Sequence, residues 1–254
     1  LRFFTEALMP AVDDWQPIII IIATLTMVVG NLVALVQKNI KRLLAYSSIG
    51  HVGYLMLGVA SMASVNSEGV ISLDKSHLAS NAIMFHLMAY GITNLAAFLS
   101  VITIYNSTGK ENISSFAGMA KRAPFLSMVF AVSLFSLAGL PIFAGFTSKF
   151  YLFTAASAQG LLWLAGVAIF ASLLSMYYYL IVIRQLYIEA PSDETPIRVP
   201  KLTLALLSTL LLGIVWLGIY PAPLINMLQH ASDAILTLNP VSQLTMSLDY
   251  ATFR

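Results

Sequence analysis

The stretch SLFSLAGLPIFAGFTSKFYLFTAASA, residues 133–158, decides the fold because it places a lysine inside a long apolar segment. Between Ala123 and Ile183, Lys149 is the only side chain of the Asp, Glu, Lys, Arg or His kind. A charged ammonium at the centre of a bilayer costs about 2.5–3.5 kcal/mol on insertion scales, and ionisable groups inside spans usually face protein or water and carry function. Lys149 is therefore a candidate functional residue if it lies deep in a membrane.

The depth of Lys149 depends on whether its helix is continuous. A straight span of about 20 residues would end before Lys149 and leave it at the far interface, where lysine can extend its ammonium to water. Gly139, Pro141 and Gly145 predict a break instead, because proline removes a helix hydrogen bond and clashes with the preceding turn. The two halves of a broken span at 124–159 together cross a core of about 30 Å and place Lys149 near its middle. Broken helices at this depth pack in protein or line a wet cavity, and they often mark ion sites.

The composition assigns the rest of the chain to a membrane as well. Of 254 residues, 59% are hydrophobic and 9% are charged, and the mean hydropathy is +0.85, whereas a soluble domain carries about 25% charged residues. The sequence contains no cysteine, which excludes disulfides, iron–sulfur clusters and thiolate metal sites on this chain. Its four scattered histidines match no metal-binding motif. We therefore expect no metal, no bound cofactor and no nucleic-acid partner.

Apolar segments long enough to cross a bilayer occur six times. They cover residues 17–37, 40–63, 79–105, 124–159, 161–188 and 202–222. This pattern predicts an all-α, polytopic membrane helical bundle of about six transmembrane helices, one of them broken. Most of the 13 Lys and Arg residues fall in the loops on one side, which the positive-inside rule assigns to the cytoplasm. Both ends of the chain are then expected on the periplasmic side, and residues 223–254 are expected to form an amphipathic surface helix or an irregular tail.

Two of the spans carry polar stripes. Ser47, His51 and Tyr54 recur at helical spacing in the second span, which puts them on one face. The third span repeats the pattern with His86, Tyr90 and Asn94. A polar stripe inside lipid faces other helices, either as a packing seam or as a hydrogen-bonded path in which histidine can titrate near neutral pH. The spacing leaves both interpretations open.

The fifth span ends in three consecutive tyrosines at residues 177–179, just before Arg184. Tyrosine is enriched at membrane–water interfaces. The triplet is therefore interpreted as part of an aromatic belt on the cytoplasmic side.

Three stretches together resemble the antiporter-like membrane subunits of respiratory complex I. They are GNLVALVQKNIKRLLAYSSIGHVGYL at 30–55, SLAGLPIFAGFTSKFYLF at 136–153 and SMYYYLIVIRQLYIEAP at 175–191. The first two resemble, more loosely, the subunits of multisubunit cation/proton antiporters. The third, with its tyrosine triplet, favours the branch of the family formed by NADH-quinone oxidoreductase subunit N. The resemblance covers nearly the whole chain, in order.

The resemblance implies that residues 1–222 form the second half of an antiporter-like, proton-translocating membrane domain, with LRFF as the end of the preceding helix. Members of this family contain two inverted five-helix repeats, each with a broken helix. Lys149 matches the lysine of the second broken helix, a proton-transfer group in the family. Tyr90 lies where related subunits carry His or Lys, and His86 is one turn away. The first broken helix, with its lysine and paired glutamate, is absent from this sequence.

The function that the resemblance implies is that of a proton-translocating membrane-arm subunit of NADH:quinone oxidoreductase in a bacterial inner membrane. The enzyme is then the whole complex, which uses NADH and a quinone, while this chain has no redox centre. Its partners would be the other membrane subunits of complex I and the lipid bilayer. A lysine in a low-dielectric site can switch its protonation state. Lys149 is therefore expected to carry protons, with His86 and Tyr90 feeding it and with His51, Tyr54 and Asn94 as a candidate polar path.

Two alternatives remain open at this point. The chain could belong to a multisubunit Na⁺/H⁺ antiporter or a membrane hydrogenase, which share the looser motifs. It could also be a structural membrane subunit without a transport role, in which Lys149 pairs with an acidic residue of a neighbour. A secondary carrier for a small solute is a further, weaker alternative.

Overall fold

The computed structural model describes residues 3, 8, 11–62, 73–191 and 195–236, and these form a bundle of α-helices. The helices are α1 (Val12–Leu35), α2 (Ile40–Ala60), α3 (Leu73–Thr108), α4 (Met119–Arg122), α5 (Pro124–Ala138), α6 (Ala144–Ala158), α7 (Leu162–Tyr187), α8 (Lys201–Ile219) and α9 (Ala222–Leu236), with a 3₁₀ turn, η3, at Ile113–Phe116. Within the described residues, β-pairing is limited to one isolated bridge between Asn39 and Asn112. The expectation for the chain after residue 236 falls outside the described residues, as does that for LRFF apart from Phe3.

The predicted all-α membrane bundle is confirmed. Five of the described helices are long and apolar enough to cross a membrane: α1, α2, α3 from Ser76, α7 and α8. The fourth predicted span is divided into α5 and α6, as the glycine and proline pattern indicates. The third helix is longer than predicted, because it begins at Leu73 and ends at Thr108 rather than covering 79–105.

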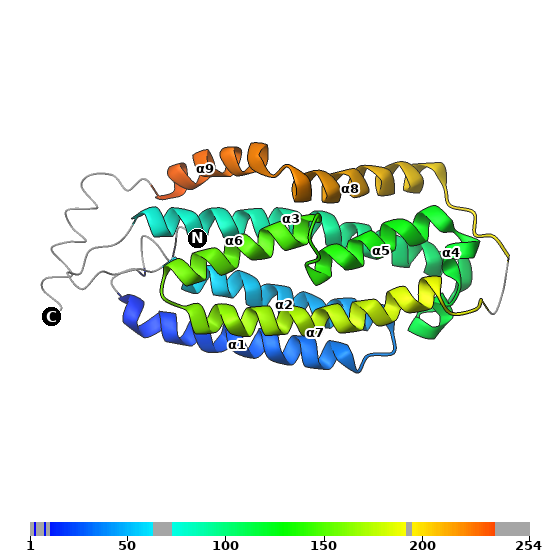
Figure 1. Cartoon of the computed structure of the whole chain (residues 1–254), viewed down its shortest axis with the longest axis horizontal. Helices are drawn as coiled ribbons and strands as arrows, with labels where there is room; N and C mark the ends of the chain where they lie inside the picture. Colours follow the sequence, from blue (N-terminus) through cyan, green and yellow to red (C-terminus); the bar gives the residue numbers. More distant parts are fainter. Residues whose placement is uncertain (1–2, 4–7, 9–10, 63–72, 192–194, 237–254) are drawn as a thin grey trace, which may run out of the picture.

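The broken helix lies inside the bundle. Figure 1 shows α8 and α9 along one side, α1 and α7 along the other, and α5 and α6 end to end between them. Helix α6 contacts α2, α3, α7 and α8, so the break is enclosed by protein on several sides. This is the setting in which interrupted backbone is tolerated at membrane depth.

Glycines bring α1 and α2 together closely enough for their backbones to touch. A Cβ added to Gly30 would lie 2.8 Å from the backbone nitrogen of Gly50, and one added to Gly53 would lie 2.8 Å from the backbone nitrogen of Met27. Small residues allow this approach between membrane helices, where dispersion contacts and hydrogen bonds replace the hydrophobic effect. Helices α1 and α2 are therefore packed closely against each other along the glycine positions.

The apolar interior consists of two main clusters. One is built largely on α2, α5 and the second halves of α3 and α7, and includes Phe130, Leu137 and Tyr178. The other is built on α1, α2, α6 and the first halves of α3 and α7, and includes Tyr54 and Leu152. The break between α5 and α6 lies where the two clusters meet.

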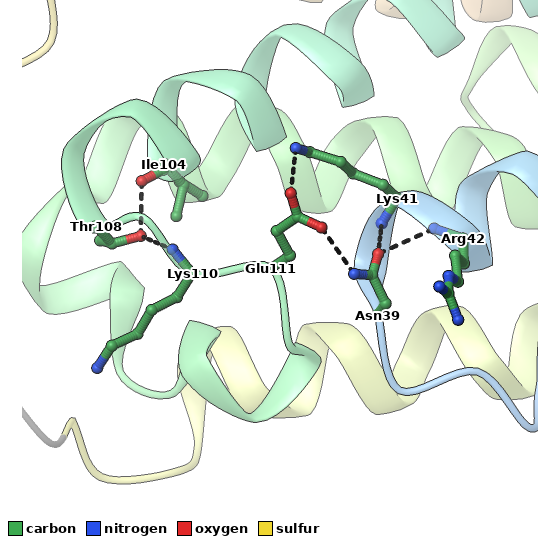
Figure 2. A network of polar contacts seen from close by, with 7 residues as sticks. All are labelled: Asn39, Lys41, Arg42, Ile104, Thr108, Lys110 and Glu111. Carbon is green, nitrogen blue, oxygen red and sulfur yellow. Dashed lines mark hydrogen bonds and ion pairs between the residues drawn. The ribbon is translucent and has the colours of Figure 1, made fainter.

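A polar clamp fixes the start of α2 to the segment after α3 (Figure 2). The Asn39 side chain caps α2 by accepting hydrogen bonds from the backbone N–H groups of Lys41 (2.9 Å) and Arg42 (3.1 Å), and its amide donates to Glu111 at 2.8 Å. The Lys41 ammonium lies 2.6 Å from the other Glu111 oxygen and 3.7 Å from the centre of the Tyr105 ring. The clamp thus satisfies N–H groups that every helix leaves unpaired at its start.

The amphipathic segment after the last span forms helix α9, most of whose described side chains are exposed. It packs against α3, and Leu228 and Ser232 are buried there. The hydroxyl of Ser232 lies 3.3 Å from Nδ1 of His77. These contacts cover part of the apolar stripe of α9.

Candidate functional site

The helix break begins with a turn that only glycine adopts easily. Gly139 has φ = 87°, and its N–H donates to the carbonyls of Phe135 and Ser136. The N–H of Leu140 then donates to the Phe135 carbonyl at 3.0 Å, which completes a Schellman motif. Pro141 follows and cannot continue a helix. The first half-helix therefore ends at Ala138.

The second half of the break is held by a strained residue and by helix α8. Ile142 has φ = 82°, a conformation that is rare for a β-branched side chain. A Cβ on Gly218 of α8 would collide with the carbonyl group of Ile142, so the two backbones are in direct contact. The hydroxyl of Thr147 donates to the Gly218 carbonyl at 3.2 Å. Helix α8 thereby covers the break.

The two half-helices cap each other. The N–H of Gly145, near the start of α6, donates to the Ser136 hydroxyl at 3.0 Å, and a Cβ on Gly145 would collide with the Ser136 carbonyl. In return, Lys149 of α6 donates from Nζ to the carbonyls of Leu137 (2.8 Å) and Ala138 (3.3 Å) at the end of α5. Gly139, Pro141 and Gly145, the residues predicted for the break, all lie in this joint.

Lys149 is buried, with 2% of its surface exposed, and its ammonium is surrounded by neutral oxygens. The third partner is the Ser172 hydroxyl of α7, at 2.9 Å, so each of the three N–H donors has an acceptor. The last carbonyls of α5 also carry the negative end of the helix dipole, which favours a cation. Within the part of the chain that the structure describes, no carboxylate contacts this ammonium.

Two neighbours shape the space around the ammonium. A Cβ on Gly139 would lie 3.2 Å from Cδ and 3.4 Å from Nζ of Lys149, so glycine leaves room for the lysine to lie across the end of α5. Tyr54 presents its ring face, with its centre 5.0 Å from Nζ, a distance suited to a cation–π contact. Tyr54 was predicted as part of a polar path, and the structure places it directly beside Lys149.

The two histidines of the predicted stripes meet next to the lysine. His86 Nδ1 lies 3.0 Å from the hydroxyl of Ser148, the residue before Lys149, and His86 Nε2 lies 3.4 Å from His51 Nδ1. Both histidines are buried. The second and third spans therefore contribute to one polar cluster rather than to two separate seams.

Tyr90 of α3 also belongs to this cluster. Its ring stacks on that of His51 with 4.6 Å between the ring centres, and its hydroxyl donates to Ser48 at 2.7 Å. Asn94 lies one turn further along α3 and is partly buried. In the described structure it makes no hydrogen bond to this cluster, whereas its neighbour Thr93 contacts the Ser136 hydroxyl at 3.2 Å.

The aromatic-belt interpretation of the tyrosine triplet is wrong for two of its members. Tyr177 is 60% exposed, but Tyr178 and Tyr179 are buried. The Tyr178 hydroxyl donates to Oδ1 of Asn31 at 2.9 Å, and the Tyr179 hydroxyl pairs with Ser47. Three consecutive helical residues point about 100° apart, so they cannot all face the lipid headgroups. This helical geometry could have predicted from the sequence that some of the three tyrosines are buried.

The hydroxyls that contact the lysine and His86 were also missed. They belong to Ser172 and Ser148. Serine is common in membrane helices as a packing residue. A single serine in an apolar segment therefore does not reveal that it faces an ammonium or an imidazole.

Comparison with known proteins identifies the chain's relatives. The family model described as "NADH:quinone oxidoreductase/Mrp antiporter, TM" matches residues 1–175. NADH-quinone oxidoreductase subunit N of Moorella thermoacetica is 41% identical over 89% of this chain and 45% of its own length. The chain thus spans about half the length of this relative.

Solved structures share the fold. A chain of the membrane-bound sulfane sulfur reductase, an archaeal respiratory membrane complex, superposes with a TM-score of 0.76 at 29% identity, over 94% of this chain and 44% of that one. A chain of respiratory complex I from Thermus thermophilus superposes with a TM-score of 0.74 at 23% identity, over 89% of this chain and 46% of that one.

Proposed function

We propose that the chain carries protons across a bacterial inner membrane through Lys149. The premise is that the chain belongs to the NADH:quinone oxidoreductase/Mrp antiporter transmembrane family. It acts as part of a membrane-arm subunit N of an NADH-quinone oxidoreductase, as its relative in Moorella thermoacetica is named. The other subunits of that complex would use NADH and quinone. Residues 1–222 would supply one half of the proton-translocating domain, and residues 223–254 would follow it as a tail.

The observation that carries this proposal is the environment of the Lys149 ammonium. Its acceptors are two carbonyls and one hydroxyl, all neutral. A buried lysine paired with a carboxylate would be held in its charged form, because removing its proton would leave the acid unpaired. Neutral acceptors impose no such penalty, and a neutral amine can still donate to two of them. The site can therefore hold the lysine with or without its proton.

In this proposal the lysine exchanges protons with the histidine cluster, which contacts the residue before it on α6. Ser148 precedes Lys149 on α6 and contacts His86, which in turn contacts His51. Imidazoles and hydroxyls can both donate and accept, so this arrangement supplies the alternating groups that proton transfer needs. Tyr90 extends it toward Ser48 on α2. In the positive-inside orientation, Ser48 lies toward the cytoplasmic end of α2, and both ends of the chain face the periplasm.

Lys149→Met in the full-length subunit of the assembled complex tests the proposal. We expect proton pumping, measured in vesicles during NADH oxidation, to fall at least tenfold, while the complex remains assembled. Lys110→Met is the matched control, because Lys110 is exposed after α3 and a change there should leave pumping unchanged. Normal pumping by an assembled Lys149→Met complex would refute a proton-carrying role and favour a structural subunit.

The same preparation also tests whether the subunit belongs to a cation antiporter or a membrane hydrogenase instead. Co-purification of the full-length subunit with NADH-oxidising partners supports the assignment to an NADH-quinone oxidoreductase. Co-purification with cation-antiporter or hydrogenase subunits instead would overturn that assignment, and Lys149 would then serve a related machine.

A further inference from the structure

The hydroxyl of Ser172 differs from the other partners of the Lys149 ammonium. Nζ donates to the carbonyls of Leu137 at 2.8 Å and Ala138 at 3.3 Å, and to Ser172 Oγ at 2.9 Å. A backbone carbonyl can only accept a hydrogen bond, whereas a hydroxyl can both accept and donate. Among the described hydrogen-bond partners of Nζ, Ser172 is thus the one group that can donate to this nitrogen.

In the charged state, every N–H and O–H hydrogen of this site has an acceptor. The ammonium uses its three hydrogens on the two carbonyls and on Ser172, whose own hydroxyl donates to the Ala138 carbonyl at 3.1 Å. Nζ, Ser172 Oγ and the Ala138 oxygen therefore form a closed triangle with sides of 2.9, 3.1 and 3.3 Å. The Ala138 oxygen can accept both bonds because a carbonyl has two lone pairs.

In the neutral state, the nitrogen of Lys149 has two hydrogens and one lone pair. The two hydrogens can stay on the carbonyls of Leu137 and Ala138, which leaves the lone pair facing Ser172. A buried lone pair needs a donor, because it has lost the hydrogen bond that water would give it. Ser172 supplies one by turning its hydrogen from the Ala138 oxygen to Nζ, since a hydroxyl hydrogen rotates to suit its partners. No heavy atom has to move.

Gly139 keeps the space between the two atoms open. A Cβ at this position would lie 3.4 Å from Lys149 Nζ and 3.4 Å from Ser172 Oγ. The φ of 87° at Gly139 also turns the chain away from α5 directly after Ala138, so the last carbonyls of α5 stay available to the lysine. The glycine that ends the half-helix therefore also shapes the triangle.

The other titratable groups near the triangle do not replace Ser172. Tyr54 of α2 turns its ring face toward Nζ, which attracts a cation but offers no hydrogen to a lone pair. His51 of α2 and His86 of α3 contact each other, and the two buried tyrosines of α7 bond to residues of α1 and α2. On α6 itself, Tyr151 packs against α3. Helix α5 has no titratable side chain, and α8 has only Lys201, at the end away from the break.

We propose that Ser172 is a positioning residue for Lys149, whose hydroxyl accepts a hydrogen bond from the ammonium and donates one to the neutral amine. The nitrogen is thereby held at the end of α5 in both states, within reach of the same partners. This inference rests on the proposed function, in which Lys149 gains and loses a proton. Because Ser172 belongs to α7, the lysine stays linked to α5 and α7 throughout.

Ser172→Ala and Ser172→Thr in the full-length subunit of the assembled complex test this role. We expect Ser172→Ala to lower proton pumping in vesicles about tenfold, the lower end of what a hydrogen bond to a charged group contributes. Ser172→Thr keeps the hydroxyl, and the partly buried position leaves room for a methyl group, so pumping should stay near the native rate. Ser133→Ala is the matched control, because this buried hydroxyl donates to the Val129 carbonyl of its own helix at 2.8 Å.

Maps of the complex at low and high pH distinguish the reversal of the hydrogen bond from a merely structural role. In the native complex, Nζ should lie on Ser172 Oγ at both pH values. In Ser172→Ala, the lysine should stay at the end of α5 at low pH and turn away at high pH, where the neutral amine has no donor. A lysine that keeps its place in Ser172→Ala at both pH values would overturn the proposal, as would a native lysine that leaves Ser172 at high pH.

The positioning role of Ser172 and the proton-carrying role of Lys149 fail under different results. Native pumping by Ser172→Ala, beside lost pumping by Lys149→Met, would overturn the positioning role and leave the proton-carrying role intact. Normal pumping by Lys149→Met, with the expected change in the maps, would do the opposite. If Ser172→Ala does not assemble, maps of the native and Ser172→Thr complexes decide, because loss of the Nζ contact at high pH in either one overturns the proposal.

Discussion

At the scale of single residues, the site combines one cation with a large number of neutral partners. Lys149, His51 and His86 are buried together, and each described contact between them and their neighbours involves a hydroxyl, a carbonyl, an imidazole or an aromatic ring. Such groups stabilise a proton without fixing it in place, because none of them is a permanent counter-charge. This environment supports the proposal that Lys149 exchanges protons, because the described residues offer its ammonium no carboxylate.

The contact between His51 and His86 leads to a test of whether they act as one path. We expect His86→Phe and His51→Phe each to slow proton pumping by about a hundredfold, the lower end of what one proton-transfer group contributes. The double variant should be little slower than either single variant, because groups in one path are not additive. His230→Phe is the control, since His230 is exposed on α9. Additive losses, measured as pumping rates in vesicles, would show that the histidines act separately.

At the scale of elements, the break depends on how closely α8 approaches it. Gly218→Ala would force a Cβ into the backbone of Ile142 and Phe143. Overpacking of this kind costs about 1–3 kcal/mol, so we expect a lower melting temperature and weaker pumping. Gly213→Ala on the same helix should be tolerated, because its Cβ would meet Ile92 at an ordinary 3.4 Å. Equal thermal stability of the two variants in detergent would show that α8 does not support the break.

The clamp at the start of α2 gives a pH-dependent contribution to stability. Hydrogen bonds from Lys41, and then from Asn39, hold the pKa of Glu111 below its usual range. A carboxyl whose pKa is lower in the folded state stabilises the fold above its unfolded pKa, and that stabilisation disappears as the pH falls through the folded pKa.

Thermal melts of the native protein and Glu111→Gln check this contribution. The native protein should melt at the higher temperature at neutral pH, and the difference should shrink as the pH is lowered into the acidic range. Because this pair is partly exposed, the difference should also shrink in high salt. A difference that is constant with pH would mean that the Glu111 charge does not matter.

At the scale of the whole molecule, the absence of cysteine makes the orientation easy to measure. Lys110 lies after α3 and Ser157 near the end of α6, and both are exposed. The distribution of positive charge predicts that Lys110 faces the cytoplasm and Ser157 the periplasm. A membrane-impermeant thiol reagent added outside intact cells should label Ser157→Cys and spare Lys110→Cys, in a subunit from which any cysteine outside these 254 residues has been removed. The reverse labelling would invert the proposed orientation.

The sequence was sufficient for those parts of the fold that local signals encode. Hydropathy marks the six spans, and the glycines and proline at 139–145 mark the break, because backbone preferences act within a few residues. The site around Lys149 was only partly predictable. Ser172, Asn31 and Tyr178 come from helices distant in sequence, and their roles depend on which helix faces which. Tertiary packing decides this, and the periodicity of one helix cannot show it.

The mutual capping of α5 and α6 has a mechanical consequence. The bonds from Lys149 to the end of α5 are charge-assisted only while the lysine carries its proton, and such bonds are roughly twice as strong as neutral ones. If Lys149 exchanges its proton as proposed, the joint would be stiffer in the protonated state and looser in the neutral state, and α6 would gain freedom to pivot at the break. Since α6 touches α2, α3, α7 and α8, that freedom would be felt across the bundle.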